Sequence, residues 1–574
     1  MLKSCCRLAP FVLAFTPACW PADDASGKIS PDTPRTGTVR VIVRFTSAPD
    51  ATRHQKVIAL GGTLDQVLGS INSASYTMPG SAVNDLAMDA DVRQISTDHD
   101  VRGMLEFANP AVNANFALKY GFDGTGIGIA ILDSGLDKHQ DLMSLRNNNN
   151  SRVVYSESFS RGSGDTSDKY GHGTHVAGVA AGDGDLSDGS KNTYTFRGIA
   201  PNANIINLKV LDQAGNGTDS AVIAAIQRVV SLKSKYKIGV LNLSLGRPVF
   251  ESYKTDPLCQ AVEYAWKNGI TVVVAAGNYG RYNGAGNNGY GTITSPGNDP
   301  YVITVGAIND EGTATRSDDR MTSYSSKGPT ALDHIVKPDI LAPGNRVISL
   351  AMSNNSLYRQ AAGLGQLVLN SYYGNGQNGY STDYFRLSGT SISAPIVSGA
   401  VALLLQQDHT LTPDQIKARL MLTASKAFPA TSIVTDPLTG ITYTSYYDIF
   451  TVGAGYVDVW AALNNTNRST GAAISPSAVF DTASGLAHLT DTIPGLSAVW
   501  GSSAVWGSSA VWGSSVLVPS APWGNSAVWG SSAVWGSSAV WGSSAVWGSS
   551  TSIFSNSAVW GSSAVWGSSQ LTGE

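Results

Sequence analysis

Three short segments of the chain hold a carboxylate, an imidazole and a hydroxyl, each close to glycine. Asp133 directly follows the apolar run at 129–132, and His172 stands between two glycines. Ser391 follows a glycine-threonine pair and precedes an apolar stretch. In the order Asp, His, Ser, these groups match one of the recurring hydrolytic triads, in which the carboxylate orients the imidazole and the imidazole deprotonates the hydroxyl. The residue types therefore predict hydrolysis by a serine nucleophile.

Each segment taken alone also has a structural interpretation. Asp133 could simply form a turn at the end of a strand, and Ser388 or Thr390 could cap the helix that follows them. His172 and His175 could bind a metal, but the glutamate of an HExxH motif is absent and the spacing alone is weak support. We expect His175 to be a buried, hydrogen-bonded imidazole.

The elements that must position these side chains form a long α/β region at 107–465. Short apolar runs bounded by Gly, Asn or Asp alternate with helix-period segments such as 220–235, and a capping box at 412–415 starts a further helix. This alternation predicts an α/β fold with a doubly wound, mostly parallel sheet, whose carboxyl edge holds the site. The expected strands lie at 127–132, 205–210, 240–243, 271–275 and 301–305.

The composition limits the classes of function. The chain has 574 residues, with 38 Lys+Arg against 42 Asp+Glu and a net charge of −4. That balance provides no basic field, so we expect no nucleic-acid partner. Hydrophobic residues make up 42%, enough for a sizeable core. No apolar run reaches the roughly 18 residues of a membrane span, so we expect a soluble chain with no transmembrane segment.

The amino terminus resembles a secretory signal. Basic residues precede an apolar stretch at 8–15, and small residues follow it. A signal peptide at 1–22 predicts a secreted protein, extracellular or associated with the cell envelope; a disordered leader is the alternative. Removal of this segment would leave Cys259 as the single cysteine, and we expect it to be buried on a helix at 257–268.

Other changes in pattern divide the rest of the chain. A compact alternation of strands and helices at 38–106 predicts a small α+β domain before the main body. The tail holds ten of the 13 tryptophans, carries no charged residue and repeats the unit Ser-Ala-Val-Trp-Gly-Ser. A repeat of six residues, an even number, places every Trp on one side of a strand and favours a stacked β arrangement. The Gly and Ser content favours an unpaired low-complexity tail, so both interpretations stay open. A linker at 23–37 separates the signal peptide from the small α+β domain, and a linker at 466–496 separates the α/β region from the repeat tail at 497–569.

All three segments of the predicted triad resemble the signature blocks of the subtilisin-like serine proteases, the subtilases of peptidase family S8. The likeness covers about 121–464, and the leading segment at 38–106 resembles the family's inhibitor-type propeptide. The resemblance implies that Asp133 orients the imidazole, that His172 is general base and then acid, and that Ser391 attacks the scissile carbonyl.

A fourth segment, at 272–278, ends a strand with an amide side chain. It resembles the family's oxyanion-hole segment, which implies that Asn278 stabilises the charge of the tetrahedral intermediate.

The resemblance also implies a set of substrate contacts. Segments at 244–246 and 275–277 would form the two walls of the S1 cleft, 295–297 its floor, and 215–217 an edge that pairs with the substrate backbone. None of these segments holds an acidic side chain, so we expect an apolar or broad P1 preference. The implied substrate-binding residues are Ser244, Leu245, Gly246, Gly215, Asn216, Gly217, Ala276 and Gly277.

No cofactor is implied for the chemistry, but structural calcium is an open question. Asp141 matches a family position that binds calcium in some members. Asp183, Asp185 and Asp188 could add oxygen ligands, although their spacing departs from the EF-hand pattern. A solvated acidic turn is the alternative.

Two hypotheses of function follow. The first is a secreted serine endopeptidase that acts on proteins or peptides and is made as a self-processed zymogen, with its own propeptide as an intramolecular inhibitor. The alternative is a binding or surface-assembly protein in which the Trp-rich tail is the functional part, with a partner that the sequence does not identify. The intact Asp133, His172, Ser391 and Asn278 favour the enzyme.

Overall fold

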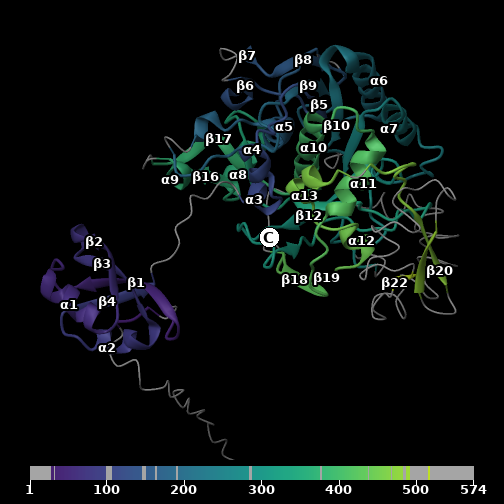
Figure 1. Cartoon of the computed structure of the whole chain (residues 1–574). Coiled ribbons are helices and arrows are strands. Elements are labelled where there is room, and N and C mark those ends of the chain that lie inside the picture. Colours follow the sequence, from purple (N-terminus) through teal and green to yellow (C-terminus); the bar gives the residue numbers. More distant parts are fainter. Residues whose placement is uncertain are drawn as a thin grey trace, which may run out of the picture. The chain divides into compact units, whose positions relative to one another are not determined.

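The computed structural model contains two compact units, Met1–Arg102 and Gly103–Glu574 (Figure 1). The sequence predicts this boundary between 106 and 107. The signal peptide predicted at 1–22 lies outside the described residues, as does the repeat tail at 497–569 apart from one two-residue strand, so both stay predictions. The described residues are 28–30, 33–97, 107–144, 150–161, 164–188, 192–282, 287–374, 378–436, 439–466, 468–481, 486–490 and 515–516.

The first unit is the small α+β domain that the alternation predicts. Its four strands form an antiparallel sheet in the order β2-β3-β1-β4. Alternate side chains such as Val41 and Val43 of β1 are fully buried in its core. The sequence did not indicate β2, because nearly all of its side chains are exposed and show no apolar alternation. The elements are β1 (Thr38–Phe45), α1 (Ala51–Ala59), β2 (Thr63–Leu68), β3 (Ser73–Pro79), α2 (Val83–Ala87) and β4 (Val92–Thr97).

The second unit is built on an eight-stranded sheet in the order β13-β12-β11-β10-β5-β9-β8, with β14 paired to β12. Every pairing is parallel except that of β12 with β13. The predicted α/β fold class is confirmed. The strands are β5 (Gly128–Asp133), β8 (Val153–Ser158), β9 (Asn204–Lys209), β10 (Ile238–Leu243), β11 (Thr271–Ala275), β12 (Ile303–Asn309), β13 (Arg320–Met321) and β14 (Ile340–Pro343).

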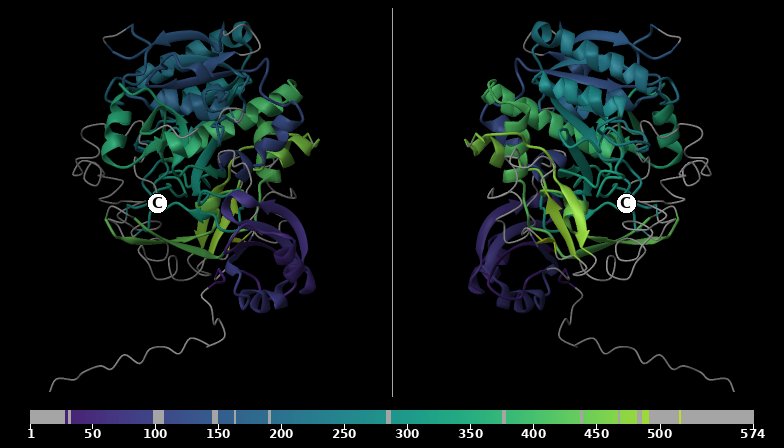
Figure 2. Two further views of the ribbon diagram at one scale, coloured as in Figure 1. Left: turned by 90° about the vertical axis from the view of Figure 1, so that its left-hand side faces the viewer. Right: turned by 90° about the vertical axis from the view of Figure 1, so that its right-hand side faces the viewer.

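Helices cover both faces of this sheet (Figure 2). α5 (His172–Ala181) and α10 (Thr390–Gln407) pack against each other and against the central strands, whereas α6 (Asp219–Tyr236) and α7 (Pro257–Lys267) pack together on the other face. Strands β5, β11 and β12 are therefore buried on both faces, which explains their continuous apolar runs. Cys259 of α7 is buried as expected, and it is a free thiol.

Two helices near the end of the α/β region illustrate what the sequence encodes. α10 is long and apolar enough to cross a membrane by length and composition, but 83% of it is buried inside the protein, as befits the central helix of a core. α11 (Pro413–Thr423) begins with the predicted capping box, in which Thr412 and Gln415 exchange hydrogen bonds.

The segment between β14 and α10 forms a small sheet of its own. Its strands β15 (Val347–Leu350), β16 (Leu367–Leu369) and β17 (Tyr380–Leu387) pair antiparallel in the order β15-β17-β16, with α8 (Ser356–Gly363) and α9 (Asn370–Tyr373) between them. β15 packs against α5. We refer to 345–387 as the insert sheet.

The linker predicted at 466–496 is not wholly a linker. It contains β20 (Ser477–Asp481) and β21 (Leu486–Thr490), which pair antiparallel, and β21 also pairs with β22 (Ser515–Val516). The sequence did not indicate these strands, because each has only five residues, fewer than the windows in which a hydrophobic period can be recognised.

Candidate active site

The carboxylate of Asp133 and the imidazole of His172 form a buried hydrogen-bonded pair. Asp133 is the last residue of β5 and His172 the first of α5, and His172 Nδ1 lies 2.7 Å from Asp133 Oδ1. Burial disfavours charge on the imidazole, but the charge of Asp133 and this hydrogen bond outweigh burial and raise the pKa of His172 above its usual value. The pair is thus arranged to accept a proton at the opposite ring nitrogen, Nε2.

Asp168 fixes the start of α5. Its carboxylate accepts hydrogen bonds from the backbone N–H of Gly171 at 2.7 Å and of Thr174 at 2.8 Å, and from the hydroxyl of Ser134 at 2.8 Å. Burial raises the pKa of Asp168, and these bonds oppose that rise. Because Ser134 directly follows Asp133, Asp168 ties the first turn of α5 to the end of β5.

Gly173 lets the helix and the strand approach each other. A Cβ atom at this position would lie 2.2 Å from the backbone oxygen of Gly135 and 3.2 Å from Cβ of Asp133. Backbone cannot yield at such a distance, so only glycine fits after His172.

Ser391 lies in the first turn of α10, which packs against α5. Its backbone oxygen accepts a hydrogen bond from Ser244 Oγ at 2.6 Å, and Ser244 Oγ is held by Asn242 Nδ2 at 2.9 Å. Ser391 Oγ and His172 Nε2 are both buried, and neither has a hydrogen-bond partner among the residues that the structure describes. Unpaired buried polar atoms are rare and costly in proteins, so a hydroxyl and an imidazole nitrogen in this state indicate a site kept for a ligand.

The side chain of Asn278 is oriented by Thr390. Asn278 Oδ1 accepts hydrogen bonds from the backbone N–H of Thr390 at 2.9 Å and from its hydroxyl at 3.1 Å. The same hydroxyl accepts the N–H of Gly277 at 3.0 Å. With its oxygen engaged, Asn278 has its NH₂ group as the donor end, and it lines the same hollow as Ser391.

Comparison with known proteins identifies the family. The sequence profile of the subtilase family, peptidase S8, matches residues 124–447, more than half of the chain. The serine protease AprX of Bacillus subtilis (strain 168) is 35% identical over 358 residues, which are 61% of this chain and 73% of that protein.

This chain is a subtilase. Two further relatives agree. Subtilisin DY of Bacillus licheniformis is 32% identical over 317 residues, 55% of this chain and 90% of its own. Subtilisin E of Bacillus subtilis (strain 168) is 28% identical over 388 residues, 66% of this chain and 82% of its own. The subtilase is therefore a serine-type endopeptidase.

Most of the predicted S1 segments of the subtilase meet beside Ser391. They enclose a hollow of about 10 Å³, roughly the space of one water molecule, and none of its lining residues is acidic. Ala276 and the predicted floor at 295–297 are not among the lining residues: Ala276 is fully buried, and Thr294, directly before the floor segment, lines the hollow instead. The lining residues are Ser244, Leu245, Gly246, Ala275, Gly277, Asn278, Tyr279, Thr294, Thr390 and Ser391.

The predicted substrate edge lies at a separate hollow. Asn216 and Gly217 line a space of about 130 Å³ together with Arg161 and Asp212. Asp212 Oδ1 accepts the N–H of Asn216 at 2.9 Å, and Gly215 has a φ of 81°, which a side chain would strain. A tight turn therefore shapes this edge.

Two of the residues weighed as metal ligands, His175 and Asp141, have protein partners. His175 is fully buried, its Nε2 lies 3.1 Å from the backbone oxygen of Val347, and burial lowers its pKa to about 3. The expectation of a buried, hydrogen-bonded imidazole is confirmed. Asp141 is also fully buried, and its carboxylate accepts hydrogen bonds from the N–H of Leu186 and the hydroxyl of Tyr384.

Sequence reasoning missed the residues that position the site. Asp168 and Thr390 contact the triad segments through their side chains, yet the sequence indicated Thr390 only as a helix cap and did not single out Asp168. The signal for Thr390 is its place directly before Ser391. Asp168, which lies 35 positions after Asp133 in the sequence, offers no comparable signal.

We expect Thr390→Val to lower kcat by about tenfold with little change in KM, because Asn278 would lose the hydrogen bond from the Thr390 hydroxyl that helps to orient it. Steady-state kinetics on a chromogenic peptide measure this. Thr390→Ser, which retains the hydroxyl, should stay near the parent.

In the double variant with Asn278→Ala, the loss should be close to that of Asn278→Ala alone, since Thr390 acts through Asn278. Multiplicative losses in the double variant would contradict this positioning role.

Proposed function

We propose that this subtilase is a secreted endopeptidase that hydrolyses peptide bonds through an acyl-enzyme on Ser391 and is made as a self-processed zymogen. The observation that supports it most is the buried Asp133–His172 hydrogen bond, which aligns the imidazole and leaves Nε2 as the base. The hydroxyl of Ser391, which lies in the first turn of the neighbouring helix and has no hydrogen-bond partner among the described residues, agrees with this role.

In the proposed first step, Ser391 Oγ forms a bond to the scissile carbonyl carbon while His172 Nε2 takes the hydroxyl proton. The electron pair of the carbonyl moves to its oxygen, and the NH₂ group of Asn278 donates a hydrogen bond to that oxyanion. Asp133 stabilises the imidazolium and remains ionised.

The imidazolium then gives its proton to the leaving amine as the C–N bond breaks, which leaves an acyl-enzyme ester on Ser391. In the second half, His172 deprotonates a water molecule that attacks the ester, and returns the proton to Ser391 Oγ as the acid product leaves. Side chains of the protein carry every proton, so the proposed chemistry uses no cofactor.

The leading domain is proposed as an intramolecular inhibitor that is cut off near residues 106–109. The leading domain forms a compact unit of its own, which supports the proposal that it can be removed as a module. Parallel sheets have many non-local contacts and fold slowly, which makes a folding template physically sensible. Secretion and an accessory role of the Trp-rich tail are proposed from the sequence pattern at 1–22 and 497–569.

Fluorophosphonate labelling with intact-mass analysis tests the proposal. We expect the purified wild-type chain to gain one label and to have lost its leading domain, whereas Ser391→Ala stays unlabelled and keeps that domain. Ser393→Ala is the matched control, because Ser393 lies in the same helix and its hydroxyl donates to the backbone oxygen of Ala342; it should still label. Labelling of Ser391→Ala would refute the assigned nucleophile, and a full-length wild-type chain that labels would refute self-processing.

Substrate selectivity is proposed to favour small P1 residues. The side chain of Thr294 lies between the two walls of the hollow: a Cβ atom at Gly246 would lie 2.5 Å from its Oγ1, and one at Gly277 would lie 2.8 Å from its Cγ2. The hydroxyl is held 3.3 Å from the backbone oxygen of Ala276. Thr294 therefore fills space that a large P1 side chain would need.

We expect the parent enzyme to prefer Ala over Phe at P1, and Thr294→Gly to raise the Phe/Ala ratio of kcat/KM by about tenfold or more. A P1-varied peptide library measures the ratio. Thr294→Ser, which removes only Cγ2, should give an intermediate ratio. A parent that cuts best after Phe, Arg or Lys would contradict the proposed selectivity.

A further inference from the structure

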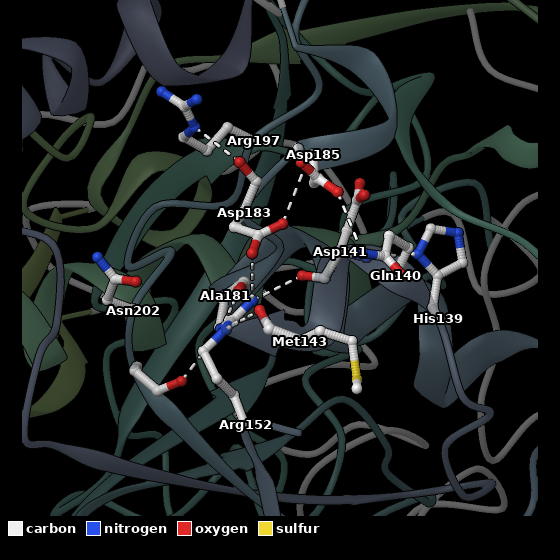
Figure 3. Close-up of polar contacts among 12 residues, drawn as sticks. His139, Gln140, Asp141, Met143, Arg152, Ala181, Asp183, Asp185, Arg197 and Asn202 are labelled. Carbon is white, nitrogen blue, oxygen red and sulfur yellow. Dashed lines mark hydrogen bonds and ion pairs between the residues drawn. The ribbon is translucent and has the colours of Figure 1, made fainter. Parts of the chain in front are cut away.

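A buried arginine joins several loops at the edge of the α/β domain. Arg152 precedes β8 and is only 4% exposed. Its Nε donates to the backbone oxygen of Met143 at 3.1 Å, Nη1 to those of Ala181 at 2.6 Å and Ala203 at 3.1 Å, and Nη2 to that of Asp141 at 2.6 Å (Figure 3). One guanidinium thus binds four carbonyl oxygens that come from three separate stretches of the chain.

The charge of this guanidinium has a nearby carboxylate. Asp183 Oδ2 lies 3.8 Å from Arg152 Nη2, and the backbone N–H of Asp183 donates to the Asp141 oxygen at 2.9 Å. Burial raises the pKa of Asp183 to about 7, and the charge of Arg152 opposes that rise. Figure 3 shows the carboxylate of Asp183 and the backbone oxygen of Asp141 directed at the guanidinium of Arg152. The junction therefore contains a cation of the protein itself, the Arg152 guanidinium, and a carboxylate partner, Asp183.

The insert sheet covers the Asp141 carboxylate. The hydroxyl of Tyr384, on β17, lies 2.5 Å from Asp141 Oδ2, and the backbone N–H of Leu186 donates to Oδ1 at 2.9 Å. Tyr384 is fully buried and packs edge-on against Phe196 at 4.8 Å and Tyr373 at 5.4 Å between ring centroids. Both oxygens of Asp141 are thus used inside the protein.

These residues do not fit a calcium ion. Calcium takes six to eight oxygen ligands at about 2.3–2.6 Å, whereas the carbonyl oxygens here point at a guanidinium that would repel a second cation. Among the described residues no group of three or more His, Cys, Asp or Glu side chains is arranged to hold a metal. The Asp185 carboxylate, a predicted ligand, instead accepts a hydrogen bond from Gln140 at 3.2 Å.

We propose that Arg152 is a built-in cation which replaces calcium at the junction of Met143, Ala181 and Ala203, with Tyr384 sealing the carboxylate of Asp141. The charge and the donors that a metal would supply are then part of the chain. The loop at 181–188 is held without metal, and its stability does not depend on calcium supply.

A calcium comparison on the full chain carrying Ser391→Ala, which prevents self-digestion, tests the first half of the proposal. Thermal unfolding and hydrogen–deuterium exchange of peptides over 181–188 are measured in EDTA and in millimolar calcium chloride. We expect exchange at 181–188 to be the same in both. We also expect any calcium-induced shift of the unfolding midpoint to be equal in the parent and in Asp141→Asn. Calcium protection of 181–188 in the parent that disappears in Asp141→Asn would overturn the proposal.

Substitution of the arginine tests the second half. Arg152→Ala should lower the midpoint in EDTA by about 5–10 °C, because Asp183 and four carbonyls would lose their partner. Arg152→Lys has one donor group instead of a planar fork, so its midpoint should lie between those of the parent and Arg152→Ala. Arg359→Ala, at an exposed arginine, should not change the midpoint. An unchanged midpoint in Arg152→Ala would overturn the proposal. If that variant does not fold, Arg152→Lys and the calcium comparison still decide it.

Discussion

The structure of this subtilase depends on one hydrogen bond at the carboxyl edge of a parallel sheet, between Asp133 and His172. A carboxylate and an imidazole buried together are costly unless each satisfies the other, so the surrounding backbone must hold them at 2.7 Å. β5 must end at Asp133, α5 must begin at His172, and Gly173 must let the two approach. The surrounding fold holds the strand end and the helix start in the positions that this hydrogen bond requires.

The same edge gathers the rest of the site from residues far apart in the sequence. Ser391 is fixed through its backbone oxygen by Ser244, and Asn278 through its side-chain oxygen by Thr390. These supports come from different strands and helices, and they act on atoms that do not take part in the reaction. Precision in the site therefore arises from contacts to other atoms, and Ser391 Oγ and His172 Nε2 keep no hydrogen-bond partner among the described residues.

Much of this architecture could be predicted from the sequence because its signals are local. An apolar run ending at Asp133 indicates a buried parallel strand, and the expected strand at 271–275 coincides with β11. The capping box at Thr412 and the burial of Cys259 also follow from their immediate neighbours. The order Asp, His, Ser of the three segments makes the triad prediction more specific than any one motif would.

What the sequence did not reveal depends on tertiary contacts. Asp168, Thr294 and Arg152 each contact residues that lie far away in the sequence. Their neighbours in the sequence show no periodicity and no motif. The insert sheet has short elements rich in Gly, Asn and Tyr, below the length at which periodicity is informative. Ala276 was predicted to contact the substrate, but it is buried and does not line the hollow. The sequence identifies the wall segment without showing which of its residues face the cleft.

The most direct test of this account is the pKa of His172, measured by NMR of histidine-labelled chain carrying Ser391→Ala, with and without Asp133→Asn. We expect a pKa above 6.5 in the parent, because the Asp133 charge and hydrogen bond outweigh burial. We expect a lower pKa in Asp133→Asn, where burial is opposed by the smaller effect of the Asp168 charge. His172→Gln identifies the resonance. A pKa of His172 that does not fall when Asp133 loses its charge would contradict the central role of this pair.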